Sequence, residues 1–590
     1  MMSMKKIFYI SAIILSAVCL AGCDSFLDTE SLTKKNTGNF PKNETDAKQM
    51  IAGIYAIMND NIADPECDPF YVFEMAGDDR LGGGSQSNIG AQTCDRLMND
   101  IIDKFKPFWE SRYAGIFRAN NAIATIDNVT EWSSKSVKDQ LLGEAYILRA
   151  FYYFNFAQIF GQVPLVLTTE AQNLPKASVE EIYAQIASDL KFAITTMPSN
   201  PYPNFGEGHV SKWVAEALMA RVWLFYTGFY HKNELPLLDG GGIVSKSEVV
   251  GWLEDCIKNS GHRLLSDQRN LWPYTNPYTA KDYNYVQQVK EKEGIALDWA
   301  TDENIESMFA IKMSNKAGWH KPELRHNRIV EYFGFRKSGA NCFPFIPQGY
   351  SNGPVCWTLW TDWAADPNYA GDYRREGSIC RRAVEIPNYP GDIAKEVENT
   401  DLISKKYMGC GAYGEDGTLY QSYGYFYGSE NDKQVGLTQA VIWLRFADVL
   451  LMHSELTDGA VVYNGMSGLN AVRDRAHLAP ISYSLENLKK ERRYELCFEA
   501  VRWNDLRRWG NVEQIVKNQE GNPILNQGAE GVYQWQASHP FMDRYNATGG
   551  GFFKIPESQI TLSEGVLEQN PGWEKAESEF AKGDLPYFKK

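Results

Sequence analysis

The amino-acid sequence predicts a mostly α-helical (all-α) protein, and three features of the chain support this prediction. Apolar residues recur at spacings of three and four over long stretches near both ends, as on one face of a helix. Residues 143–164 form a stretch that is apolar all round, ended by Gly161 and Pro164, which is typical of a helix packed on several sides. Helical periodicity fades only in the middle of the chain.

Before the middle of the chain, the spacing predicts helices around the stretch 143–164, which we expect to be the central one. These helices cover 44–58, 103–126, 178–197, 211–230 and 248–258. Further helices are predicted at 439–456, 468–476 and 485–509. Successive antiparallel helices with small residues such as Ala215, Ala217 and Ala220 where they cross are typical of tetratricopeptide-like pairs. We therefore expect such pairs to stack into a superhelical scaffold.

Between about residues 231 and 436, Pro, Gly, Asn and aromatic residues become frequent and no long helical pattern continues. Long irregular segments inside a compact protein are usually functional. We therefore divide residues 44–590 of one domain into a helical part (44–230), a variable loop-rich ligand region (231–436) and a C-terminal part of helices with a docked tail (437–590).

The N-terminus has the pattern of an export signal. Lys5 and Lys6 precede an apolar run that ends at Leu20, and Ala21-Gly22-Cys23 follows. A basic start, a short apolar segment and small residues are typical of a signal peptide. The cysteine after Leu-Ala-Gly looks like a bacterial lipobox, so we predict a signal peptide at 1–22, lipid attachment at Cys23 and a tether at 23–43. Acyl chains would anchor the protein to a membrane without spanning it.

Composition excludes some classes of function. The formal net charge of −15 argues against a nucleic-acid-binding protein, which needs a basic surface. The ten cysteines form no C-x-x-C pair and lie at no metal-ligand spacing with histidine, although one or two disulfides stay open. No G-x-S-x-G, H-E-x-x-H or phosphate-loop motif occurs. We predict no enzyme, no catalytic residue, no metal and no cofactor, and leave a structural calcium ion open.

Charged residues between 491 and 508 are predicted to be structural. Glutamates and arginines alternate there at three- and four-residue spacings on what is expected to be one helix, interleaved with Leu496, Phe498 and Trp503. Such sets usually form ion pairs that hold helices in register. Arg445 and Asp448, one helical turn apart, are interpreted in the same way.

Motifs spread over nearly the whole chain resemble the SusD/RagB family of outer-membrane lipoproteins of the Bacteroidetes type. Their order and spacing carry the resemblance, since no single block is decisive. The blocks are Phe26-Leu27-Asp28 after the lipobox, 109–120, Gly143-Glu144-Ala145 with 148–154 and 161–164, 215–221, 445–451, 470–476, 491–499, 502–508 and Gln569-Asn570-Pro571-Gly572.

The resemblance implies a cell-surface protein, lipid-anchored in the outer membrane, that captures a glycan and delivers it to a SusC-like TonB-dependent transporter. It implies carbohydrate binding and nutrient uptake without catalysis. A branch of the family that is similar in fold delivers peptides, so peptide delivery is the second hypothesis. The third is a surface glycoside hydrolase, since glycoside hydrolysis needs only two carboxylates.

A sugar site needs flat aromatic faces and planar polar groups. The resemblance places such a site in two loops, at 78–88 and 348–353. Starch-binding relatives carry a stacking tryptophan in the first loop, where this chain has glycines. We therefore expect stacking from Tyr350, Trp319 or the set Trp357, Trp360 and Trp363, which is otherwise a core stripe. The predicted ligand-binding residues are Asp79, Arg80, Gln86, Asn88, Trp319, Tyr350, Asn352 and Trp360.

Overall fold

The computed structural model of the protein describes residues 40–62, 65–82, 89–98, 103–206, 208–318, 326–336, 341–347, 349–389, 400–432, 434, 436–526, 529–532 and 541–574. Within these ranges the chain is mainly helical and its strands pair only two at a time. The expected all-α fold class is confirmed. None of the described helices combines the length and the apolar composition that crossing a bilayer requires.

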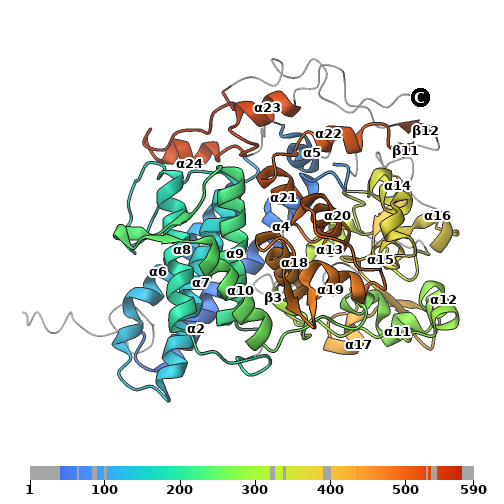
Figure 1. The fold of residues 1–590 in the computed structure, drawn as a ribbon, viewed down its shortest axis with the longest axis horizontal. Coiled ribbons are helices and arrows are strands. Elements are labelled where there is room, and N and C mark those ends of the chain that lie inside the picture. Colours follow the sequence, from blue (N-terminus) through green and yellow to red (C-terminus); the bar gives the residue numbers. More distant parts are fainter. Residues whose placement is uncertain are drawn as a thin grey trace, which may run out of the picture.

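Six helices lie side by side in one half of the molecule (Figure 1). Each contacts the next one along this series. They are α2 (Glu44–Ala56), α6 (Lys106–Thr125), α7 (Lys135–Ile159), α8 (Val179–Thr196), α9 (Lys212–Phe229) and α10 (Lys246–Asn259). The predicted helices before residue 260 are therefore present, with ends shifted by a few residues in most cases.

Helix α7 is the centre of this half, as predicted. Its residues from Gly143 to Ile159 are buried, apart from Tyr146, and it packs against both α6 and α8. A Cβ atom at Gly143 would lie 2.1 Å from the side chain of Met197, so only glycine permits this close approach of α8. The helix begins earlier than predicted, because Ser134 caps it by accepting from Val137 N and its first turns are polar.

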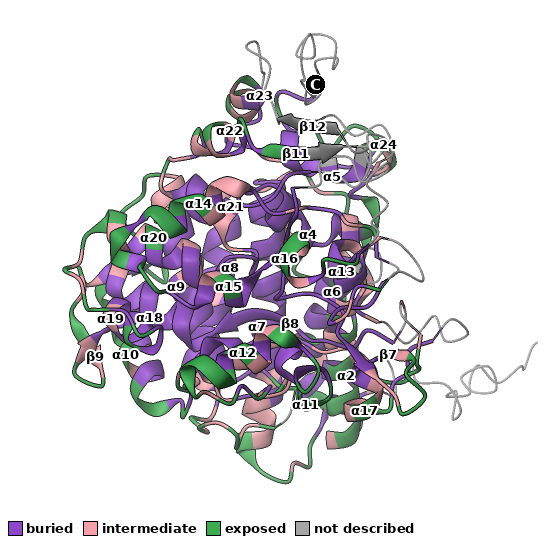
Figure 2. Cartoon of the chain, turned by 90° about the vertical axis from the view of Figure 1, so that its right-hand side faces the viewer, coloured by how far each residue is buried: buried purple, intermediate pink, exposed green. Residues whose placement is uncertain are grey.

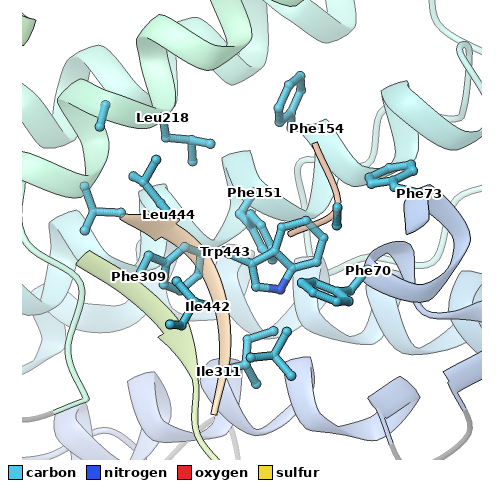
Figure 3. Packing of buried hydrophobic residues seen from close by; sticks show 14 of the residues in the cluster. Phe70, Phe73, Phe151, Phe154, Leu218, Phe309, Ile311, Ile442, Trp443 and Leu444 are labelled. Atoms are coloured by element: carbon cyan, nitrogen blue, oxygen red, sulfur yellow. The ribbon is translucent and has the colours of Figure 1, made fainter. Parts of the chain in front are cut away.

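A short antiparallel strand pair joins this half to the rest of the core (Figure 3). It consists of β3 (Ser307–Ile311) and β8 (Val441–Arg445), and Trp443 of β8 packs against Phe70 and Phe151. The predicted helix 439–456 is wrong in its first part, where β8 lies, and α18 (Phe446–Leu456) follows directly. All five residues of β8 are buried, and a short apolar run shows no period that distinguishes strand from helix.

The predicted single helix 485–509 is also wrong. The chain forms α20 (Leu485–Glu495) and α21 (Arg502–Arg508), separated by a turn in which Phe498 and Ala500 adopt φ values of 65° and 59°. Left-handed backbone at two non-glycine residues interrupts the helix, although the apolar spacing continues across the break. The preceding helix, α19 (Gly468–Arg475), matches its prediction closely.

The break places the charged residues on several elements, and they form a buried ion-pair network, as predicted. Arg445 pairs with Glu495 and Glu499 at 2.5 and 2.6 Å. Arg492 joins Asp448 of α18 to Asp505 of α21. Because all these groups are nearly inaccessible to water, each charge depends on its partners, and the network ties α18, α20 and α21 together.

The loop-rich half holds short elements (Figure 1). The helices are α11 (Pro277–Ala280), α12 (Asn284–Glu293), α13 (Arg328–Phe333), α14 (Trp357–Ala365), α15 (Arg374–Ser378), α16 (Arg382–Glu385) and α17 (Tyr423–Tyr427). Its strand pairs are β4 (Ile379–Arg381) with β5 (Leu402–Ser404), and β6 (Gly411–Tyr413) with β7 (Leu419–Gln421). The pair of β1 (Leu235–Pro236) with β2 (Ile243–Val244) lies in the other half, where β1 contacts α8 and α9.

The remaining elements lie near the two ends of the chain. They are α3 (Met58–Ile62), α4 (Pro69–Met75), α5 (Ile89–Arg96), β9 (Val461–Tyr463), β10 (Met466–Ser467), α22 (Gln514–Gln519), β11 (Pro523–Asn526), β12 (Ala529–Val532), α23 (Phe541–Ala547) and α24 (Glu557–Leu562). Figure 2 shows that buried residues fill the interior, while exposed ones follow its outer helices and loops. The predicted domain boundaries stay predictions.

Candidate functional site

The two loops in which the sequence predicts ligand contacts lie next to each other. Leu81 N donates to the carbonyl of Pro354 at 3.0 Å, and Cys356 N donates to the carbonyl of Asp79 at 2.9 Å. Segments more than 270 residues apart in the chain are thus paired through their backbones. Residues 83–88, which include Gln86 and Asn88, lie outside the described residues, as do Trp319 and Cys23.

Arg80 links these two segments from the inside. Its Nε lies 2.8 Å from Glu74 Oε2, and its Nη1 donates to the carbonyl of Gly353 at 2.7 Å. The guanidinium also lies 4.0 Å from the ring centroid of Phe333 in α13. Burial raises the pKa of Glu74, although the charge of Arg80 opposes this shift. Arg80 is 1% exposed, so in this arrangement it holds the loops rather than facing solvent.

Asp79 and Asn352 are buried as well. Asp79 pairs with Arg493 of α20 at 2.8 Å, and burial raises its pKa against the attraction of Arg493. Asn352 Nδ2 donates to the hydroxyl of Tyr71 at 3.1 Å. The sequence predicts Asp79 and Arg80 as ligand contacts, or otherwise as an ion pair with each other, but Asp79 pairs with Arg493 and Arg80 pairs with Glu74. Direct contact of Asp79, Arg80 or Asn352 with a ligand would require the two segments to separate.

Tyr350, in contrast, presents its ring to solvent and is 38% exposed. Its ring centroid lies 4.9 Å from that of Tyr332 in α13. Arg328 of the same helix donates from Nη2 to the hydroxyl of Tyr350 at 3.3 Å, and its guanidinium lies 5.3 Å from the Tyr332 ring. Two rings and one guanidinium therefore form a small aromatic surface, which we call the Tyr332–Tyr350 surface.

The backbone around Tyr350 explains why this surface is held in place. Tyr350 N donates to the carbonyl of Glu331 at 3.0 Å, and Asn352 N donates to that of Tyr332 at 2.8 Å. Between them, Ser351 adopts a φ of 56°. A Cβ atom on Gly349 would lie 2.4 Å from the backbone of Gly334, so this approach requires glycine. The loop is therefore fastened to the end of α13.

A second exposed aromatic pair was missed by the sequence reasoning. Tyr278 of α11 stacks on Tyr425 of α17 with ring centroids 4.6 Å apart and planes inclined by 19°. The two side chains are 37% and 43% exposed. The available signal was the run Tyr423-Gly-Tyr-Phe-Tyr427, but nothing in the sequence pairs it with Tyr278, which lies almost 150 residues earlier.

The three tryptophans of α14 have different roles. Trp363 is 1% exposed, stacks on Tyr494 at 4.5 Å and donates from Nε1 to Asp372, which makes it a core residue. Trp357 donates from Nε1 to the carbonyl of Thr400 at 2.6 Å. Trp360 is half-buried, and the guanidinium carbons of Arg375 and Arg381 lie 4.5 and 5.6 Å from the centroid of its ring. The helix thus has one tryptophan in the core and another at the surface.

The titratable groups of the described residues are mainly structural. The eight cysteines from Cys67 to Cys497 are buried, and burial raises the pKa of Cys497 to about 11. Within the described ranges, no three His, Cys, Asp or Glu side chains are grouped as metal ligands. Several perturbed carboxylates of the core, such as Glu491 and Glu495, belong to the ion-pair network, where arginines occupy their oxygens.

Comparisons with known proteins place the chain in a family. A family model described as "Starch-binding associating with outer membrane" matches residues 25–224, and the model of the SusD family matches residues 368–573. Together they cover more than half of the chain. The chain belongs to the SusD family. The family resemblance seen in the sequence motifs is thereby confirmed.

Individual relatives within the SusD family are distant in sequence but similar over most of their length. The SusD-like protein P2 of Formosa agariphila is 23% identical, with 97% of this chain and 100% of that protein covered. A SusD-like protein of Bacteroides ovatus is 22% identical, with 76% and 74% covered.

Among solved structures, a laminarin-binding SusD-like protein superposes with a TM-score of 0.65 at 23% identity, covering 90% of this chain and all of the other. Surface glycan-binding protein A from Bacteroides thetaiotaomicron, in complex with laminarihexaose, superposes with a TM-score of 0.67 at 18% identity over the same shares. These likenesses show that the SusD-like fold is shared.

Proposed function

We propose that this protein is a lipid-anchored glycan-binding protein of the outer membrane, exposed at the cell surface, which captures oligosaccharide and delivers it to a SusC-like TonB-dependent transporter. It acts by binding, without catalysis. Membership of the SusD family and the match to a model that describes starch binding at the outer membrane support this role. The lipobox-like sequence before Cys23 supports the anchor.

One observation carries the glycan part of the proposal, namely the exposed Tyr332–Tyr350 surface. A pyranose ring has an apolar C–H face that packs on an aromatic ring, while its hydroxyl groups need planar donors and acceptors around that ring. Arg328 supplies such donors beside Tyr350, and Gln434 lies close by, donating from Nε2 to Glu331 Oε1 at 2.5 Å. We therefore propose Tyr350 as the stacking residue.

The shape of this surface supports capture rather than enclosure. The side chain of Tyr350 is 38% exposed, and that of Tyr332 beside it is half-buried. An open surface lets the ends of a long chain extend past the protein, as binding a polysaccharide requires. The Tyr278–Tyr425 pair provides a second flat face for the same kind of contact.

Affinity gel electrophoresis against a panel of soluble polysaccharides tests the proposal. Laminarin and other β-glucans belong in the panel because relatives are named for laminarin. We expect at least one glycan to retard the protein and Tyr350→Ala to reduce the retardation. Phe117→Ala, which removes a 50% exposed aromatic from α6, is the matched control.

Two results would contradict the proposal. If no glycan retards the protein but peptides bind and are protected from proteolysis, the peptide-delivering branch is the correct reading. If the protein releases reducing ends from a glycan over hours, and a single carboxylate substitution abolishes that release, the protein is a glycoside hydrolase.

A further inference from the structure

Four arginines lie within nine residues, at 374, 375, 381 and 382, in a chain whose formal net charge is −15. The structure gives them two different roles. Arg374 is buried and pairs with Asp372, Glu491 and Glu495 at 2.6–2.8 Å. Arg382 pairs with Asp401 at 2.8 Å. These two are neutralised by carboxylates, whereas Arg375 and Arg381 are directed to the surface of α14.

Arg375 and Arg381 both lie against Trp360. Their guanidinium carbons are 4.5 and 5.6 Å from the centroid of its ring, and Arg381 is also 5.8 Å from that of Trp357. Two cations within these distances of one ring lie within about 10 Å of each other, roughly the Debye length at 0.1 M salt. They therefore repel each other unless an anion lies between or beside them.

In the part of the chain that the structure describes, the nearby carboxylates of Glu385 and Asp401 pair with Lys405 and Arg382. Arg375 pairs with Glu376 at 3.2 Å, and Glu376 is 57% exposed, so that pair is weak. In the described part of the chain, the guanidinium of Arg381 donates no hydrogen bond and forms no ion pair, and the buried Nε atoms of Arg375 and Arg381 have no acceptor. Cation–π contacts stabilise a guanidinium but do not neutralise its charge.

We propose that Arg375, Arg381 and Trp360 form a binding site for an anionic group, a carboxylate or a sulfate ester, carried by the glycan. Both groups match the planar donor fork of arginine, and charge-assisted hydrogen bonds to them are about twice as strong as neutral ones. Trp360 positions the two guanidinium groups and offers its ring edge to the sugar. The inference rests on the proposed glycan binding and names the ligand as an acidic glycan.

Matched pairs of polysaccharides test this site. One pair is polygalacturonate and its methyl ester, which differ in the carboxylate. The other is a sulfated galactan and its chemically desulfated form. The proteins to compare are the wild type, Arg375→Gln, Arg381→Gln and the control Arg263→Gln, which removes an exposed arginine outside this cluster. Binding is measured by affinity gel electrophoresis and calorimetry at low and high salt.

We expect the wild type to bind the acidic member of one pair more tightly than its neutral member. Arg381→Gln should weaken that binding about tenfold, as expected for one lost hydrogen bond between charged groups, and leave binding of the neutral member unchanged. Added salt should lower the affinity of the wild type for the acidic member toward that of Arg381→Gln, because salt screens the charges. The pair whose acidic member binds more tightly than its neutral member shows whether the site takes a carboxylate or a sulfate ester.

Equal affinity for both members of each pair would overturn the acidic-glycan inference while the proposed function stands. The same holds if Arg375→Gln and Arg381→Gln behave like Arg263→Gln. If no polysaccharide binds, neutral or acidic, the proposed function itself fails. Thermal unfolding of the variants, which we expect to match the control because both arginines are partly exposed, shows that a loss of binding reflects the site.

Discussion

Arg80 donates to the carbonyl of Gly353 across 273 positions of sequence and, through the same guanidinium, holds Glu74 in the interior. This contact fastens the segment after α4 to the segment that carries Tyr350. It connects a buried ion pair with the exposed surface proposed for glycan binding.

Replacing Arg80 by methionine should lower stability strongly. The carboxyl group of Glu74 would remain buried without its cation, a situation that costs about 3–5 kcal/mol. Denaturant unfolding measures the loss, and the double variant Arg80→Met with Glu74→Gln should recover part of it. An unchanged unfolding midpoint for the single variant would show that the ion pair between Arg80 and Glu74 does not contribute to stability.

Tyr350→Ala should weaken glycan retention roughly fivefold to tenfold, since a stacking contact contributes about 1 kcal/mol. The melting temperature should change by no more than about 2 °C, because the side chain is exposed and its removal leaves no cavity. Tyr350→Phe should keep the retention, because it preserves the ring and loses only the hydroxyl that Arg328 contacts. Equal retention by Tyr350→Ala and wild type would place the site elsewhere.

Arg502→Ala should have the opposite pattern. Arg502 binds both carboxylate oxygens of the buried Asp78, at 2.7 and 2.8 Å, and its charge helps to hold the pKa of Asp78 below its usual value against the effect of burial. We expect a loss of about 3 kcal/mol in the free energy of unfolding and unchanged glycan retention by the folded protein. If Arg502→Ala lost glycan retention at an unchanged free energy of unfolding, Arg502 would be a ligand-binding residue and not a structural one.

Glu216 of α9 should make stability depend on pH. Burial raises its pKa from 4.5 to about 8, although Lys212 lies 3.2 Å away. Between these values the folded protein holds a proton that the unfolded chain releases, so the free energy of unfolding falls as pH rises from about 4.5 to about 8. Glu216→Gln should remove this slope, whereas the exposed Glu131→Gln should keep it. Chemical denaturation across that pH range measures both.

Cys23→Ala should release the protein from the membrane fraction, since the variant cannot carry the acyl chains that anchor it. Fractionation of cells with immunodetection checks this result. A variant that still sediments with membranes would contradict the lipobox interpretation.

The helical part of the protein could be predicted well because its signals are local. Helix α8 has a period-3.6 apolar pattern and α7 is apolar all round up to its end near Gly161, and these patterns depend only on neighbours in sequence. The same reasoning failed at β8 and at the turn between α20 and α21. There the backbone is decided by packing partners far away in sequence, such as β3 and the carboxylate of Glu74, which accepts from Ala500 N at 2.7 Å.

The candidate site could be predicted only in part. Tyr350 was identified by its position between small polar residues, and the structure places it at the surface. Asp79 and Arg80 look equally suited to a ligand in the sequence, but Glu74, Arg493 and Gly353 occupy their hydrogen-bonding groups. A sequence shows which groups can bind, whereas only the tertiary structure shows which of them are already bound.

The sequence by itself determined the all-α class, the central helix, the predicted export signal and the family, because each is written in local periodicity or in the order of motifs. The tertiary structure decided which aromatic and charged side chains are left free. It buries Trp363 but leaves Trp360 half-buried, and it neutralises Arg374 but leaves Arg381 without a carboxylate partner in the described chain. Exposure and pairing depend on residues brought together from distant positions, so no local pattern encodes them.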